Sequence, residues 1–85
     1  MSILKVSIRQ VKAARALLGW SQDELAARSG TSIPTVKRLE AGDGDLGGRQ
    51  ETTSKIVDAI QEAGVLFIEA NGAGPGVRLR DPPSQ

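Results

Sequence analysis

Apolar positions recur with the period of an α-helix over most of the first 64 residues. Stripes of this spacing run through residues 8–18, 22–29, 33–41 and 50–63. Residues three or four apart share one face of a helix, so each stripe predicts a helix with one buried side. Gly19 and Gly30 follow the first two stripes, where a helix commonly ends in left-handed backbone.

Polar residues mark the starts of the first two helices. Ser7 stands three residues before Gln10, and Ser21 stands three residues before Glu24. Both spacings fit the capping box, in which the hydroxyl and the later side chain each bond to the other's backbone amide. Apolar staple pairs are expected to flank these caps, with Val6 on Val11 and Trp20 on Leu25.

The third predicted helix has two chemically different faces. Ser32 is a suitable N-cap, and Pro34 lies in the first turn, where its missing amide proton costs little. One side carries Val36, Leu39 and Glu40, and the opposite side carries Pro34, Lys37, Arg38 and Ala41. The second side has no apolar role, so we expect it to face solvent or a ligand.

The period changes after Gly64. Residues 65–68 and 77–80 each predict a strand, and the glycine-rich segment 71–76 between them predicts the turn of a hairpin. The fold class is therefore mainly α, with a four- to five-helix bundle and a C-terminal β-hairpin. We expect a helical domain over residues 1–64, the hairpin over 65–80 and a frayed tail over 81–85.

Composition narrows the possible functions. The 85-residue chain contains no Cys and no His, so thiolate and imidazole metal sites and the usual neutral-pH acid–base group are missing. We expect no metal, no cofactor and no enzymatic activity. The longest apolar run is residues 65–68, far too short to span a membrane, so a cytoplasmic protein is expected.

Charge is distributed unevenly along the chain. Residues 1–42 carry seven cations and three anions, whereas residues 43–69 carry two cations and six anions. The basic first half favours a polyanionic partner, although solvated helix faces would give the same pattern.

Two short helices joined by a Gly-containing turn can place the second helix in the major groove of DNA. The string from Leu18 to Gly42 resembles the XRE family, the Cro/phage-repressor helix-turn-helix regulators. The matching features are Gln22, Glu24-Leu25-Ala26, Gly30, Ser32, Val36, Leu39 and Glu40. The resemblance covers about residues 11–63 and implies binding to a double-stranded DNA operator.

The resemblance also implies which residues meet DNA: Ser21, Gln22, Ser32, Ile33, Pro34, Thr35, Lys37 and Arg38. Ser21, Gln22 and Ser32 would touch phosphates, and Arg38 is the best candidate to bond guanine through two hydrogen bonds. Ile33 and Pro34 stand where relatives often carry Gln, so contact with a thymine methyl is the expected replacement. Arg15 and Glu40 resemble the family's ion pair and are expected to support the fold.

The implied function is a transcriptional repressor or autoregulator that blocks an operator as a homodimer. An antitoxin or other protein-binding adaptor using the same helix-turn-helix is the alternative. We expect the hairpin to form the dimer interface through Val65, Leu66, Phe67, Ile68, Val77 and Leu79, because residues 65–68 are apolar on both faces. A hairpin that packs only on its own helices is the other possibility.

Overall fold

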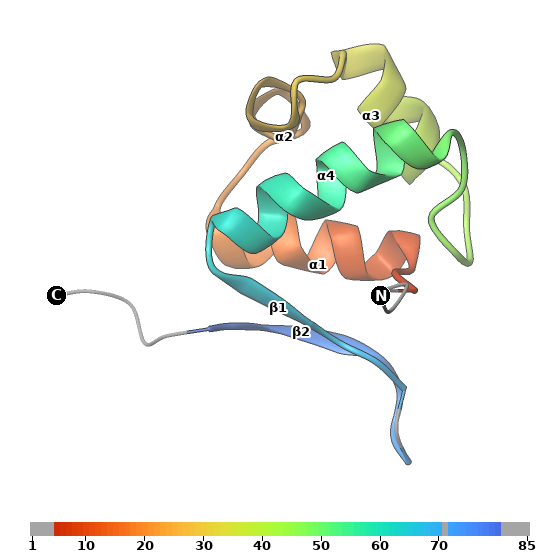
Figure 1. The fold of residues 1–85 in the computed structure, drawn as a ribbon, viewed down its shortest axis with the longest axis vertical. Helices are drawn as coiled ribbons and strands as arrows, with labels where there is room; N and C mark the ends of the chain where they lie inside the picture. The colour runs from red at the N-terminus through yellow and green to blue at the C-terminus, as the bar shows by residue number, and fades with distance from the viewer. Residues whose placement is uncertain (1–4, 71, 81–85) are drawn as a thin grey trace, which may run out of the picture.

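The helices and strands lie where the sequence pattern places them, to within one residue at each end. The computed structural model describes residues 5–70 and 72–80, so the predicted tail lies outside the described residues. The elements are α1 (Ile8–Leu18), α2 (Gln22–Ser29), α3 (Ile33–Glu40), α4 (Gln50–Glu62), β1 (Val65–Ile68) and β2 (Gly76–Leu79). The mainly helical fold with a C-terminal hairpin is confirmed (Figure 1). Within the described residues no helix is long and apolar enough to cross a membrane.

One of the two predicted capping boxes is complete. Ser7 Oγ accepts from the backbone of Gln10, and Gln10 Oε1 accepts from the backbone of Ser7. Ser21 Oγ likewise accepts from the backbone of Glu24 at 3.0 Å. The reciprocal half of the second box was predicted wrongly, because the Glu24 carboxylate accepts from Arg28 Nε at 2.6 Å instead. An i,i+4 ion pair on the surface of α2 has taken the place of the backbone bond.

A shared apolar core joins all four helices and the first residue of β1. Its most deeply buried side chains are Leu25, Ile56, Ile60, Val11, Val36 and Val65. All four residues of the predicted staples belong to this core or pack against it. The apolar stripe predicted over residues 50–63 ends earlier than expected, since Ala59 is buried whereas Ala63 is exposed. Ala63 lies beyond the last helical residue, where the backbone no longer follows the stripe.

The hairpin and α3 lie on opposite sides of the helical bundle, with α1 and α4 between them (Figure 1). The loop after α3 is attached to the residues that precede α1. Ile8 N–H donates to Gly44 O, and Leu46 N–H donates to Val6 O, both at 2.8 Å. These bonds fix the end of α3 relative to the start of α1.

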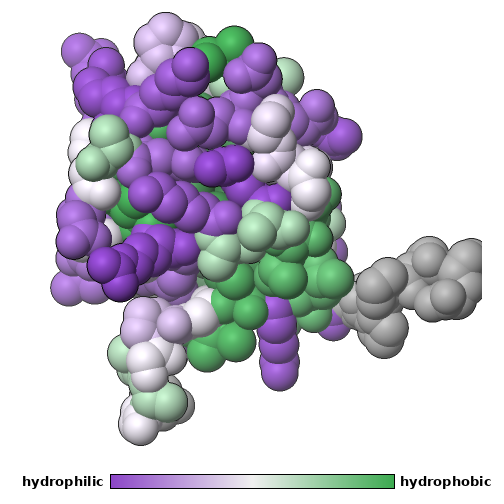
Figure 2. Space-filling view, turned by 180° about the vertical axis from the view of Figure 1, so that it is seen from behind, coloured by the Kyte–Doolittle hydropathy of each residue, from purple (hydrophilic) through white to green (hydrophobic). Residues whose placement is uncertain are grey.

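The hairpin presents an apolar face to the helices and a mixed face to solvent, where Leu66 pairs with the exposed Arg78. Val65 pairs with Leu79 and Phe67 pairs with Val77, and these four residues belong to the core or pack against it. Leu66 and Ile68 lie on the other face, because side chains alternate along a strand. Ile68 is 40% exposed. Figure 2 shows apolar surface gathered at the hairpin, below the mostly polar surface of the helices.

Candidate nucleic-acid interface

A tight turn sets α3 against α2. Gly30 adopts φ +72°, and the N–H groups of Gly30 and Thr31 both donate to Ala26 O. The buried hydroxyl of Ser29 donates to Leu25 O at 2.7 Å and contacts Thr31 Oγ1 at 2.8 Å. These bonds satisfy the last carbonyls of α2, which allows the chain to reverse direction within three residues.

The two faces of α3 differ as the sequence predicts. Val36 and Glu40 are buried at 1% and 4% exposure, whereas Pro34, Lys37 and Arg38 are exposed. Among the described residues, no side chain forms a hydrogen bond or ion pair with Lys37 or Arg38. Both cations therefore project from α3 with their donors available to an external acceptor.

The N-terminus of α3 offers few donors. Ser32 Oγ accepts from Thr35 N–H at 3.2 Å and lies 2.7 Å from Thr35 Oγ1. One of the two hydroxyls donates its proton to the other, so one hydroxyl proton remains for an external acceptor. Pro34 contributes no amide proton. A ligand at this helix end would thus meet one hydroxyl donor and the amide of Ile33.

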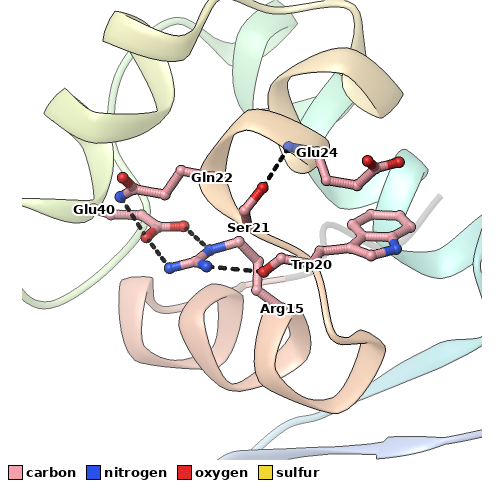
Figure 3. A network of polar contacts seen from close by, with 6 residues as sticks. All are labelled: Arg15, Trp20, Ser21, Gln22, Glu24 and Glu40. Atoms are coloured by element: carbon pink, nitrogen blue, oxygen red, sulfur yellow. Dashed lines mark hydrogen bonds and ion pairs between the residues drawn. The ribbon is translucent and has the colours of Figure 1, made fainter.

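The N-terminus of α2 has an exposed N-cap and a side-chain amide that is held in place. Ser21 is exposed and uses its hydroxyl oxygen as the N-cap acceptor for Glu24. Gln22 is half-buried, and its Nε2 donates to Glu40 Oε1 at 3.0 Å (Figure 3). The Gln22 side chain therefore has a defined position, fixed by α3, and keeps its second amide proton and its carbonyl oxygen.

Arg15 and Glu40 form the predicted ion pair. Arg15 Nε and Nη2 donate to the two carboxylate oxygens at 2.8 and 2.7 Å, and Nη1 donates to Trp20 O at 3.0 Å (Figure 3). The Arg15 and Glu40 side chains are 20% and 4% exposed. The arrangement ties α1 to the end of α3 and to the connection before α2.

The protonation of this pair follows from its contacts. Burial alone would raise the pKa of Glu40, but hydrogen bonds from Arg15 and Gln22, with attraction to Arg15 and Lys12, lower it below its ordinary value. The hydrogen bond with Glu40 raises the pKa of Arg15 against the opposing effect of burial. Both groups are therefore charged at neutral pH.

The structure brings the eight predicted DNA-contact residues to the N-terminus of α2 and the N-terminus and outward face of α3. Two contacts of this region are absent from the predictions: the bond from Gln22 to Glu40, and the Arg28 guanidinium that lies 5.1 Å from the centre of the Trp20 ring. The first contact crosses 18 residues and has no local signal. The second joins α2 to Trp20, which precedes the N-cap and therefore does not follow the helical period.

Comparison with known proteins agrees with this geometry. A helix-turn-helix family model matches residues 11–60, which include α2, α3 and the turn between them. No curated protein matches the sequence. The chain therefore belongs to the XRE/Cro-like helix-turn-helix family and is a DNA-binding regulator.

Proposed function

We propose that the protein is a sequence-specific transcriptional repressor that occupies operator DNA as a homodimer. The observation that carries this proposal is the outward face of α3, where Lys37 and Arg38 are exposed and uncommitted while the opposite side of the helix is buried. A helix held in this way can enter the major groove without rearranging the core. Repression then follows because the bound dimer excludes other proteins from the site.

The residues of α3 divide into specificity and affinity roles. Arg38 donates two hydrogen bonds to the O6 and N7 atoms of one guanine, and Lys37 binds backbone phosphate. Ile33 is 36% exposed and contacts a thymine methyl group, beside the exposed ring of Pro34. The remaining proton shared by Ser32 and Thr35 reaches a phosphate oxygen.

The start of α2 supplies the second phosphate contact. The backbone amides of Gln22 and Asp23 are the free donors of its first turn, since Ser21 caps Glu24. The Gln22 amide adds its second proton. Because Glu40 holds Gln22 before DNA arrives, little side-chain entropy is lost on binding.

The dimer forms through the outward face and edges of the hairpin. Among the six residues expected at the interface, Ile68 and Leu66 are available on the uncovered face. Val65 is 1% exposed within its own subunit, so its contribution is to hold the strand in place. In the described residues the sheet has two strands, so each strand has one unpaired edge. A second copy would cover both the apolar side chains and these edges.

A selection experiment tests the proposal. Purified protein is mixed with random double-stranded DNA, bound duplexes are amplified, and the same selection is done with the Arg38→Ala variant. We expect the wild-type protein to enrich two inverted half-sites about 34 Å apart, and the variant to lose preference at one base pair in each. Absence of any enriched sequence would overturn sequence-specific repression. If the protein is a monomer in light scattering and enriches single half-sites, the homodimer is overturned. That result would favour the alternative in which the hairpin binds a different protein.

A further inference from the structure

Gln10 uses both ends of its side-chain amide. Its Oε1 accepts from the Ser7 backbone at 2.8 Å and so completes the capping box of α1. Its Nε2 donates to two carbonyl oxygens of the hairpin, Gly76 O at 2.9 Å and Ile68 O at 3.1 Å. The residue is only 4% exposed. One side chain therefore caps the first helix and binds the C-terminal hairpin.

Capping alone does not explain why this residue is an amide. Glu completes a capping box as well as Gln does, and a carboxylate is favoured near a helix N-terminus. An ionised carboxylate, however, has no proton to donate. The two hairpin carbonyls are the groups that require the N–H donors of Gln10.

The bonds from Gln10 act at the far end of the hairpin. Ile68 and Gly76 are paired residues next to the turn, whereas Val65, at the other end of β1, is buried in the core. These two attachments on β1 are about 10 Å apart along the strand. Two attachments at this separation fix the direction of the hairpin. Without the Gln10 bonds, the hairpin would be held mainly by apolar packing against the core. Such packing is non-directional, so the hairpin could pivot about Gly64, whose φ is +105°.

We propose that Gln10 is a positioning residue for operator recognition, because it sets the angle between the hairpin and the helices. The proposal rests on the proposed function, in which the hairpins join two subunits. The loop that follows α3 is bonded to Val6 and Ile8, so α3 and the hairpin are both held by the start of α1. The angle that Gln10 fixes thereby sets the separation of the two α3 helices in the dimer.

Small changes in this angle matter for DNA. The shortest dimension of the protein is 25 Å. A rotation of about 10° moves a point at that distance by about 4 Å, which exceeds the rise of about 3.4 Å per base pair. A hairpin free to pivot would therefore accept half-sites at several spacings.

The test compares three variants of the full chain on duplexes whose two half-sites differ in spacing by one base pair at a time. Gln10→Glu keeps the capping acceptor and removes both donors to the hairpin. Gln10→Met removes both functions without burying a charge. Ser7→Ala is the matched control, since it removes the hydroxyl cap and leaves the two bonds to the hairpin.

We expect the wild-type protein and Ser7→Ala to prefer one spacing by about tenfold over its neighbours, and both Gln10 variants to retain less than about threefold. Affinity for a single half-site should stay within about twofold. Amide hydrogen exchange should become faster in β1 and β2 of the Gln10 variants while α2 and α3 remain protected.

Three other outcomes would overturn the proposal. A wild-type spacing preference that both Gln10 variants keep would overturn the role of Gln10 and leave the dimer intact. Absence of a preference in the wild-type protein, with monomers in light scattering, would overturn the dimer and the positioning role together. Global unfolding of both Gln10 variants would also overturn the proposal, because a positioning residue leaves the helical core folded.

Discussion

α3 and the C-terminal hairpin are alike in construction and differ in what they present to solvent. Each is a short element with one face in the core, through Val36 in α3 and Val65 in the hairpin. The outward face of α3 carries Lys37 and Arg38, whereas that of the hairpin carries Leu66 and Ile68 beside the exposed Arg78. A cationic face suits a polyanion, and exposed apolar side chains suit another protein surface. The contrast is consistent with our proposal that α3 binds DNA and the hairpin joins two subunits.

The two elements also differ in how they are attached. Glu40 holds α3 through a charged network, and Gln10 holds the hairpin through a neutral amide, although both side chains are 4% exposed. A buried charge that loses its partner costs more than a neutral group that loses one. Replacing Glu40 should therefore lower the stability of the whole fold. Replacing an outward residue of the hairpin should instead change the oligomeric state.

The largest effect is expected for Glu40→Ala. The change leaves Arg15 unpaired with its side chain only 20% exposed, which should lower the free energy of unfolding by about 3 kcal/mol. Thermal denaturation followed by circular dichroism measures the loss, and Glu40→Gln is the control that keeps the shape of the side chain. Normal stability together with abolished DNA binding would show that Glu40 acts in recognition instead of the fold.

Ile68→Asp should act on assembly with little effect on folding. Placing a carboxylate on the outward face of the hairpin should give a monomer in light scattering and weaken operator binding about 100-fold, because the benefit of two linked half-sites is lost. Leu17→Asp is the matched control, since Leu17 is a similarly exposed apolar residue on α1, at 44% against 40%. The interface would have to lie elsewhere if Ile68→Asp remained dimeric.

Arg38→Ala should reduce discrimination at one base pair of each half-site by about 1–3 kcal/mol. Lys37→Ala is the comparison within the same helix face. It should weaken all sequences similarly and reduce the salt slope by about 1. Titrations of the selected operator and its single-base variants at several salt concentrations distinguish the two. If both substitutions weakened binding to every sequence equally, Arg38 and Lys37 would not have separate roles in specificity and affinity.

Lowering the pH should produce a smaller change in the free energy of unfolding, and this change reports the contribution of the Glu40 charge. Because the pKa of Glu40 is lowered in the folded protein, its charge stabilises the fold above the unfolded carboxyl pKa of about 4.3. This stabilisation is lost as the pH falls through the lowered pKa. The difference in unfolding free energy between wild type and Glu40→Gln should therefore shrink on acidification. A difference that stayed constant with pH would assign the effect to shape alone.

Local sequence determined the helices and their faces. The cap of Ser7, the left-handed glycines and the apolar stripes act within one or two turns, so their consequences can be read from neighbouring residues. The same holds for the division of α3 into a buried and an exposed side. The ion pair of Arg15 with Glu40 was also predicted, through the resemblance to a family and without any local signal.

Tertiary structure decided the contacts between distant residues. Gln22 meets Glu40 across 18 residues, and Gln10 meets Ile68 and Gly76 across 58 and 66. Only packing settles such contacts, because a polar side chain selects among competing partners by their distance and burial, which the order of residues along the chain does not contain.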